Sequence, residues 1–397
     1  TVITVDSGAP TTLGSVAVTP TVVPGGSSKV VKFKVTLQNP APAGGIKVNL
    51  ASSNPSVAGM PASVTIPEGV LTRSVTVSHT SVSTNTSVNL TATYHSDVLS
   101  AALLVEAPKP LSVVNLPNAV VGRTATIVNS TVTLTAPAPS EGTLVDLSSS
   151  NTSAAMPAVS SVTVPAGATT ATFTVNHFSV PVLRNLYIRG AANGVTKSGA
   201  LAVKPPTLVL VSIAPASVTG GSTSAATGTV KINAPAPSAG SKVLLSDDSA
   251  STATPASVTI PSGATEATFN ITHASVASNT VVTITAVYNA TKTDTLTLLP
   301  PRLSSFTLNR TSVKGGSTTV VTGTVTLNAV APAGGTVVTL SSSNASAASV
   351  PASVTVPAGA TTATFTITHS AVGSPVAVTL TAIGGGVTLT KTLTVNP

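Results

Sequence analysis

Apolar and polar residues alternate along many short segments of this chain. In residues 31–37 (VKFKVTL), every second residue is large and apolar, and lysine or threonine lies between them. Val230 and Ile232 repeat this spacing before Pro237, and residues 325–327 repeat it before Pro332. Alternation with a period of two predicts a β-strand with one buried face. No segment shows the 3.6-residue apolar period that would indicate a helix.

A later strand is predicted after a histidine that recurs at positions 79, 177, 273 and 369. At offsets +9, +11, +13 and +15 from each histidine the chain has Val88, Leu90, Ala92 and Tyr94; Leu186, Ile188, Gly190 and Ala192; Val282, Ile284, Ala286 and Tyr288; and Val378, Leu380, Ala382 and Gly384. Residues at these offsets share one face of a strand, so we expect them to fill the core. Core filling is also the expected role of the two tyrosines.

The whole pattern occurs four times. The phrases NPAPAGG, APAPSEG, APAPSAG and AVAPAGG surround Pro42, Pro139, Pro237 and Pro332, at intervals of 97, 98 and 95 residues. A phrase such as PASVTIPEG follows each of them, and a phrase such as VSHTSV comes next. A period this long predicts a small domain rather than a solenoid unit. We expect an extra strand and linker in residues 1–12, and repeats in residues 13–108, 109–205, 206–300 and 301–397.

Each repeat holds about seven predicted short strands separated by Pro, Gly and Ser-Asn turns. This number of strands in about 95 residues is typical of an immunoglobulin-like sandwich. The predicted fold class is therefore all-β, with four tandem immunoglobulin-like β-sandwich domains. Prolines at the seams, such as Pro205-Pro206 and Pro300-Pro301, favour extended linkers and hence an extended rod.

Several phrases resemble bacterial immunoglobulin-like repeats of the invasin and intimin type. These are residues 52–58 and 341–348, residues 351–367, and VTITAVY at 282–288. The resemblance implies a surface-protein domain, although this chain has no tryptophan and no cysteine pair. The phrase VPAGATTATFTV, residues 164–175, has a weaker likeness to Calx-β domains, which implies calcium sites. Only 10 acidic residues serve four repeats, with Asp247–Asp248 the one pair, which does not favour calcium binding.

Charged residues make up 7% of the chain and aromatic residues 2%. The net charge of +8 comes from 18 scattered basic and 10 acidic residues. Nucleic-acid binding needs clustered basic residues with aromatic stacking platforms, so we expect no nucleic-acid partner. No apolar run approaches the roughly 18 residues of a membrane helix, so we expect no membrane span.

The recurring histidines invite a catalytic or metal-binding interpretation. They occur once per repeat, however, and a metal site needs three or four converging ligands. We expect each to be a turn histidine whose ring nitrogen holds the loop before the late strand. Neither a nucleophile elbow nor a Ser-His-Asp set is evident. The chain is therefore predicted to be non-enzymatic, with no cofactor and no metal.

Residues 1–5 (TVITV) read as a strand outside the complete repeats, with Val2, Ile3 and Val5 as its apolar residues. One interpretation is the last strand of a preceding domain, or a segment packed on the first repeat. The other is a donor strand that adds to the sheet edge of a neighbouring molecule.

The second repeat departs from the pattern at an outward position. Tyr187 lies at offset +10, where the other repeats have asparagine or threonine. Arg184 and Arg189 flank it, and Phe178 follows His177. Tyrosine and arginine are enriched at contact surfaces, which predicts a partner contact here. The alternative is local repacking against a seam between repeats.

These observations predict an extracellular or cell-surface structural protein, the subunit of a filament, sheath or layer. Its expected partners are copies of itself, and other surface proteins or glycans are further candidates. The alternative function is the stalk or spacer of a bacterial adhesin, whose repeats need no binding site. A carbohydrate-binding module is a weaker third candidate, because sugar platforms usually rely on aromatic faces.

Overall fold

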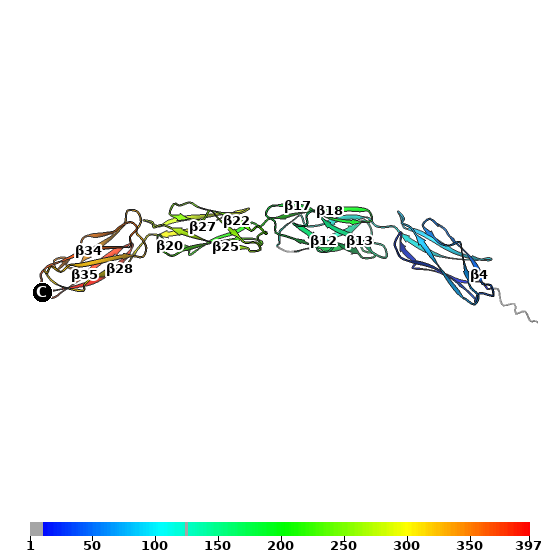
Figure 1. Ribbon diagram of the computed structural model, residues 1–397, viewed down its shortest axis with the longest axis horizontal. Coiled ribbons are helices and arrows are strands. Elements are labelled where there is room, and N and C mark those ends of the chain that lie inside the picture. The colour runs from blue at the N-terminus through cyan, green and yellow to red at the C-terminus, as the bar shows by residue number, and fades with distance from the viewer. Residues whose placement is uncertain (1–10, 124–125) are drawn as a thin grey trace, which may run out of the picture. The chain divides into compact units, whose positions relative to one another are not determined.

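The computed structural model describes residues 11–123 and 126–397, and the regular elements in this part of the chain are all β-strands, nine per repeat (Figure 1). The first repeat contains β1 (Leu13–Thr19), β2 (Val22–Pro24), β3 (Val31–Leu37), β4 (Ile46–Ser52), β5 (Ala58–Gly59), β6 (Ser63–Ile66), β7 (Thr72–His79), β8 (Thr86–Tyr94) and β9 (Asp97–Glu106). The second contains β10 (Leu111–Asn115), β11 (Ala119–Val121), β12 (Ile127–Leu134), β13 (Thr143–Ser149), β14 (Ala155–Pro157), β15 (Ser161–Val164), β16 (Thr170–His177), β17 (Arg184–Ala192) and β18 (Val195–Lys204). The third contains β19 (Leu208–Ala214), β20 (Ser217–Thr219), β21 (Ala226–Ile232), β22 (Ser241–Asp247), β23 (Thr252–Ala253), β24 (Ser257–Ile260), β25 (Glu266–His273), β26 (Thr280–Val287) and β27 (Thr291–Leu299). The fourth contains β28 (Leu303–Leu308), β29 (Ser312–Lys314), β30 (Val321–Leu327), β31 (Thr336–Ser342), β32 (Ala348–Ser349), β33 (Ser353–Val356), β34 (Thr362–His369), β35 (Val376–Gly384) and β36 (Val387–Asn396).

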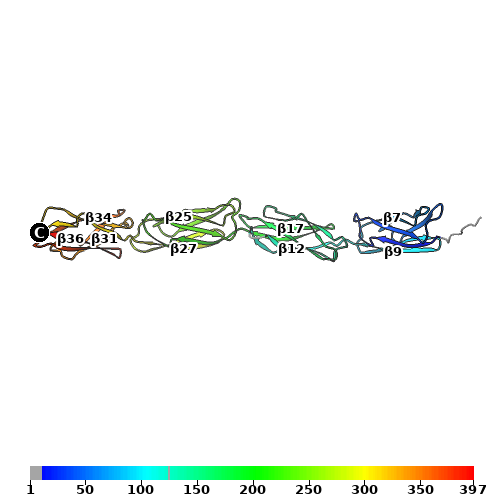
Figure 2. The ribbon, with the colours of Figure 1, turned by 90° about the horizontal axis from the view of Figure 1, so that it is seen from below.

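Each repeat is a sandwich of a four-stranded and a five-stranded sheet. In the first repeat the strand orders are β1-β3-β7-β5 and β2-β9-β8-β4-β6, and the other repeats have the same two orders. Figure 2 shows β7 and β9 on opposite sides of this sandwich. The predicted all-β fold of four tandem immunoglobulin-like sandwiches is confirmed.

The expectation of about seven strands per repeat was wrong, because two short strands escape a periodicity argument. The first strand is divided between the two sheets: β1 pairs with β3, and β2 runs parallel to β9 in the other sheet. The second short strand, β5, adds two residues to the edge of β7. Segments of two or three residues are too short to show alternation, so only their pairing defines them.

The described chain divides into two compact units. One comprises the residues up to Phe178 together with Leu183–Lys204, and holds the first two sandwiches. The other comprises Ser179–Val182 and Pro205–Pro397, and holds the last two.

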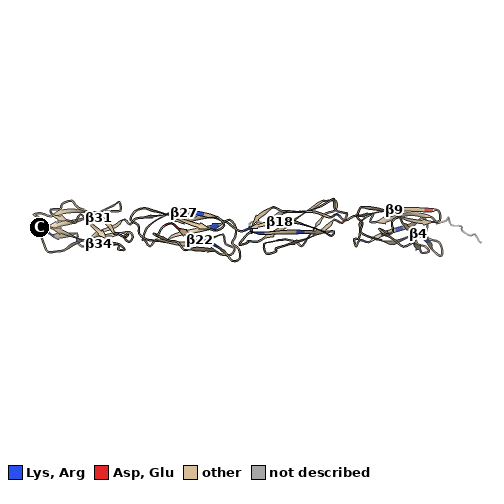
Figure 3. Ribbon diagram, turned by 90° about the horizontal axis from the view of Figure 1, so that it is seen from above, with Lys and Arg blue, Asp and Glu red and all other residues tan. Residues whose placement is uncertain are grey.

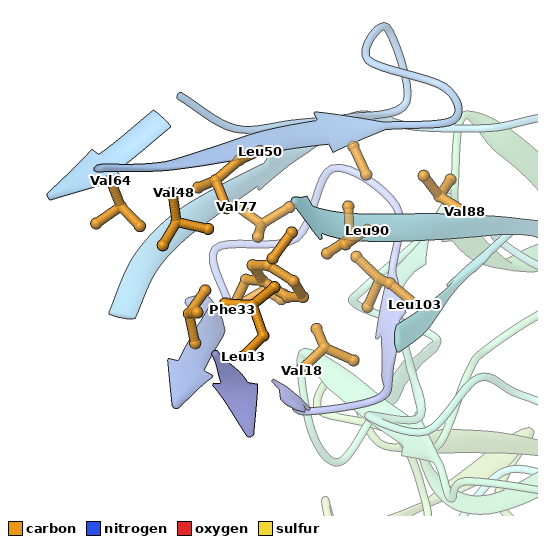
Figure 4. Close-up of a cluster of buried hydrophobic side chains, with 14 of the residues drawn as sticks. Leu13, Val18, Phe33, Val48, Leu50, Val64, Val77, Val88, Leu90 and Leu103 are labelled. Atoms are coloured by element: carbon orange, nitrogen blue, oxygen red, sulfur yellow. The ribbon is translucent and has the colours of Figure 1, made fainter. Parts of the chain in front are cut away.

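The core of each sandwich comes from the alternating positions of both sheets. In the first repeat Phe33 is fully buried, and Figure 4 shows its ring in the middle of the cluster. The late strand has the expected burial, with Val88, Leu90 and Ala92 inaccessible to solvent. Tyr94 packs against this core at its half-buried end, as expected. The equivalent Tyr288 also packs on its core, and its hydroxyl accepts a hydrogen bond from the Ser241 hydroxyl at 2.9 Å.

At one core position, phenylalanine and the smaller residue opposite it exchange strands between repeats. In the first repeat the buried Phe33 of β3 pairs with Val75 of β7. In the third and fourth repeats glycine occupies the β3 position and phenylalanine the β7 position, as Gly228–Phe269 and Gly323–Phe365. A side chain at either glycine would collide with the ring of its partner. One aromatic ring therefore fills this part of the core, and the residue opposite must be smaller.

Candidate interaction surfaces

The recurring histidines each end the seventh strand of their repeat and hold a loop by its backbone. In the third repeat, Nε2 of His273 donates to the carbonyl oxygen of Ser224 at 2.8 Å, and Nδ1 accepts from the Gly221 N–H at 3.2 Å. A carbonyl can only accept and an N–H can only donate, so this ring is neutral with its proton on Nε2. His79 and His369 make the same Nε2 contact, to Lys29 and Thr319 at 2.9 Å.

The predicted structural role of these histidines is right, but the predicted loop is wrong. The ring holds the loop that follows the second strand of each repeat, not the loop before the late strand. In the second repeat Nδ1 of His177 accepts from the Arg123 N–H at 3.0 Å. His177 is buried, and this burial lowers its pKa below the ordinary value. No group of three or more His, Cys, Asp or Glu side chains gathers as a metal site within residues 11–123 and 126–397.

The predicted contact residues of the second repeat do not all share one surface. Tyr187 and Arg189 point outward from β17, and Tyr187 is 53% exposed. Arg184 is also exposed, but it begins β17 on the opposite alternation, in line with the buried Leu186. Phe178 is 37% exposed and follows β16, which belongs to the other sheet. Only Tyr187 and Arg189 therefore form a continuous patch.

Three small residues on the neighbouring strands surround this outward patch. Across the sheet, Tyr187 pairs with Ala200 of β18, and Arg189 pairs with Ser148 of β13 and Ser198 of β18. These small partners leave the ring and the guanidinium standing above the sheet. The other predicted contact residues, Val2, Ile3 and Val5, lie outside the described residues.

Two repeated loops meet where consecutive repeats join inside each unit. We call residues 25–29, 220–224 and 315–319 the Gly-Gly loops, and residues 38–45, 135–142 and 328–335 the proline loops. In the first unit, Nζ of Lys29 forms an ion pair with Glu141 at 3.0 Å. Gly26 and Pro139 line the same pocket, which shows that the Gly-Gly loop of the first repeat faces the proline loop of the second.

The second unit uses the same two loops. The side-chain amide of Asn328 donates to the hydroxyl of Thr219, the residue immediately before the Gly-Gly loop, at 3.2 Å. A Cβ placed on Gly221 would lie 2.7 Å from Val330, so the backbone of this Gly-Gly loop contacts the proline loop directly. Two loops whose sequences recur along the chain therefore form the joint between repeats in both units.

Charge is sparse on the strands (Figure 3). In the part of the chain that the structure describes, the ion pairs are Lys29–Glu141 at 3.0 Å and Lys231–Glu266 at 3.9 Å. No helix among the described residues is long and apolar enough to cross a membrane.

No known protein-family model matches the sequence, and no curated protein matches it. Among solved structures, the D0–D1 domains of intimin match at 14% identity over 48% of this chain and 99% of that chain, with a TM-score of 0.21. Domains 4–9 of the surface layer protein SbsC match at 14% identity over 97% of this chain and 66% of that one, with a TM-score of 0.27. The Yersinia pseudotuberculosis adhesin InvE matches at 15% identity over 48% and 60%, with a TM-score of 0.29. The intimin and invasin-like proteins that the sequence resembles are thus among its structural neighbours, and the likeness concerns the fold alone.

Proposed function

We propose that this chain is a non-enzymatic, extracellular structural protein, a subunit that associates with copies of itself in a surface filament, sheath or layer. The observation that carries the proposal is the low density of charge on the outer faces of its sheets, which is clearest in the fourth repeat (Figure 3). In the fourth repeat, Thr379 of β35 pairs with Thr392 of β36, and Thr381 pairs with Thr390, all on the outward alternation. Val337 of the adjoining β31 is 60% exposed.

Such faces favour assembly over solitary solubility. Like charges on approaching surfaces repel, and a protein with few charged side chains lacks this protection against association. Threonine and valine on flat strands also provide β-branched side chains that pack well on a second surface. Negative-stain microscopy of the purified chain tests the proposal. Ordered fibres or sheets would support it, whereas isolated particles at all concentrations would favour the adhesin stalk instead.

Two finer proposals concern the contacts. The first is that Tyr187 and Arg189 touch a partner, with Arg184 and Phe178 at the margins of that contact. The double variant Tyr187→Ala with Arg189→Ala should weaken assembly, whereas Thr379→Ala, at the position equivalent to Tyr187 in the fourth repeat, should not. Unchanged assembly of the double variant would remove this contact from the proposal.

The second is strand addition through residues 1–5. The five-stranded sheets end in strands of three and four residues, such as β2 and β6. Such short edges pair poorly, so the acceptor would be the first strand of a four-stranded sheet, such as the seven-residue β19. Deletion of residues 1–12 should weaken assembly while the repeats stay folded. The extended rod expected from the seam prolines also stays a prediction, which small-angle scattering of the full chain tests.

A further inference from the structure

We propose that molecules associate head to tail through the same joint that connects the repeats. The Gly-Gly loop of the fourth repeat, residues 315–319, would dock on the proline loop of the first repeat, residues 38–45, of a second copy. The inference rests on the proposed self-association and specifies one further contact that contributes to it.

The internal joints provide the first argument. Both units contain a Gly-Gly loop against a proline loop, with an ion pair in one and a side-chain hydrogen bond in the other. Pro139 and Pro332, in the proline loops of these joints, are buried. Pro42, at the same position in the first repeat, is exposed. Among the described residues, the proline-loop surface at Pro42 is therefore uncovered, whereas the equivalent surface is covered in the second and the fourth repeats.

Charge complementarity provides the second argument. Glu141, which holds the joint of the first unit, corresponds to Gly44 in the first repeat. There the exposed Glu68 accepts a hydrogen bond from the Gly44 N–H at 3.4 Å, which places a carboxylate at the equivalent point of the loop. Lys314 immediately precedes the glycine pair of the fourth repeat and is exposed. Glu68 and Lys314 are not in ion pairs among the described residues, so each is free to meet the other.

The geometry of such a contact determines what it builds. The two surfaces are different patches, one on the first repeat and one on the fourth, so the contact is heterologous. Heterologous contacts that do not close into rings produce open filaments. The contact is made by two loops, which predicts a weak, salt-sensitive association that grows with concentration.

Charge reversal in the full-length chain tests the proposal. Sedimentation velocity over a concentration series at low salt should show association of the unmodified protein. Glu68→Lys and Lys314→Glu should each weaken it by about tenfold, because the pair then repels. Asp146→Lys and Lys292→Glu, which reverse exposed charges that lie outside both loops and in no ion pair, are the matched controls and should leave association unchanged.

Mixing the two variants gives the decisive result. In an equimolar mixture, the new positive charge at position 68 of one variant meets the new negative charge at position 314 of the other. The unmodified Glu68 of the second variant likewise meets the unmodified Lys314 of the first, so association should return. If the unmodified chain associates but neither reversal weakens it, or if mixing fails to restore it, the head-to-tail joint is wrong and self-association stands. If the unmodified chain stays monomeric at every concentration, the proposed function itself fails.

Discussion

The exchange of phenylalanine and glycine between neighbouring strands makes a sharp prediction about the core. In the fourth repeat Gly323 of β30 pairs with Phe365 of β34, whose ring is 7% exposed and lies 6.0 Å from the Phe306 ring. A Cβ on Gly323 would lie 2.8 Å from Cε1 and Cε2 of Phe365 and would also collide with Cζ. The ring is packed in the core, so it cannot move away freely.

The expected size of the effect follows from two opposing terms. Overpacking a core costs about 1–3 kcal/mol, and replacing glycine inside a strand returns about 0.5–1 kcal/mol of backbone entropy. Gly323→Ala should therefore destabilise the fourth repeat by about 1–2 kcal/mol. For a domain of this size, that lowers the midpoint of thermal unfolding by roughly 5–10 °C.

The sign should reverse when the ring is removed. Phe365→Val replaces the ring with valine, the residue at the equivalent position of the first repeat, Val75. In this background Gly323→Ala has no ring to collide with and should stabilise the fourth repeat by about 0.5–1 kcal/mol. Calorimetry of the full chain, with hydrogen exchange in β30 and β34 to assign the transition, measures both backgrounds. Gly373→Ala is the control, because its Cβ would have no atom within 4 Å. A coupling energy below about 0.5 kcal/mol between the two positions would refute the packing argument.

Three further predictions concern the second repeat. Ser130 of β12 pairs with Phe173, is fully buried, and its hydroxyl has no hydrogen-bond partner among the described residues, so Ser130→Ala should stabilise by about 1 kcal/mol in calorimetry; destabilisation would contradict the burial argument. Arg123 has φ of 59° where the other repeats have glycine, so Arg123→Gly should raise the unfolding free energy by about 1 kcal/mol, and a loss would show that its side chain outweighs the backbone strain. Because burial lowers the pKa of His177, the unfolded chain binds the proton more readily, so stability should fall as pH drops below about 6.5 towards the folded pKa. Denaturant titrations from pH 7.5 to 5 should show this slope reduced in His177→Gln, and an equal slope in both proteins would count against it.

Alternation along the chain predicts the long strands and their buried faces because these depend on local periodicity. Phe33, Leu90 and Val325 all lie on the predicted faces. The sequence could not show that Phe33 in one repeat and Phe365 in another fill the same space. That equivalence depends on the register between two strands far apart in the sequence, and register becomes visible only when the strands are paired.

The sequence predicted which residue types would make contacts better than it predicted where those residues would lie. Period-two alternation correctly placed Tyr187 on the outward face of β17. The same rule places Arg184 in line with the inward-facing residues, so Arg184 should not have been grouped with Arg189 as a neighbour of Tyr187. The histidine partner was missed for a different reason. His79 forms a hydrogen bond with the backbone carbonyl of Lys29, which is 50 residues away. Every residue has a backbone carbonyl, so the sequence does not reveal which one the histidine binds.

The histidines and the joints are parts of one arrangement. In the third repeat, His273 holds Gly221 and Ser224 by their backbones, and Gly221 is also the residue that contacts Val330 of the fourth repeat. The ring ends a strand of the sandwich, so it fixes the Gly-Gly loop relative to a rigid element rather than to another loop. A joint made of two free loops would have to order both of them on contact, at about 1–2 kcal/mol for each residue fixed. Holding the loop in advance removes much of that cost, which gives a structural reason for the histidine that ends the seventh strand of every repeat.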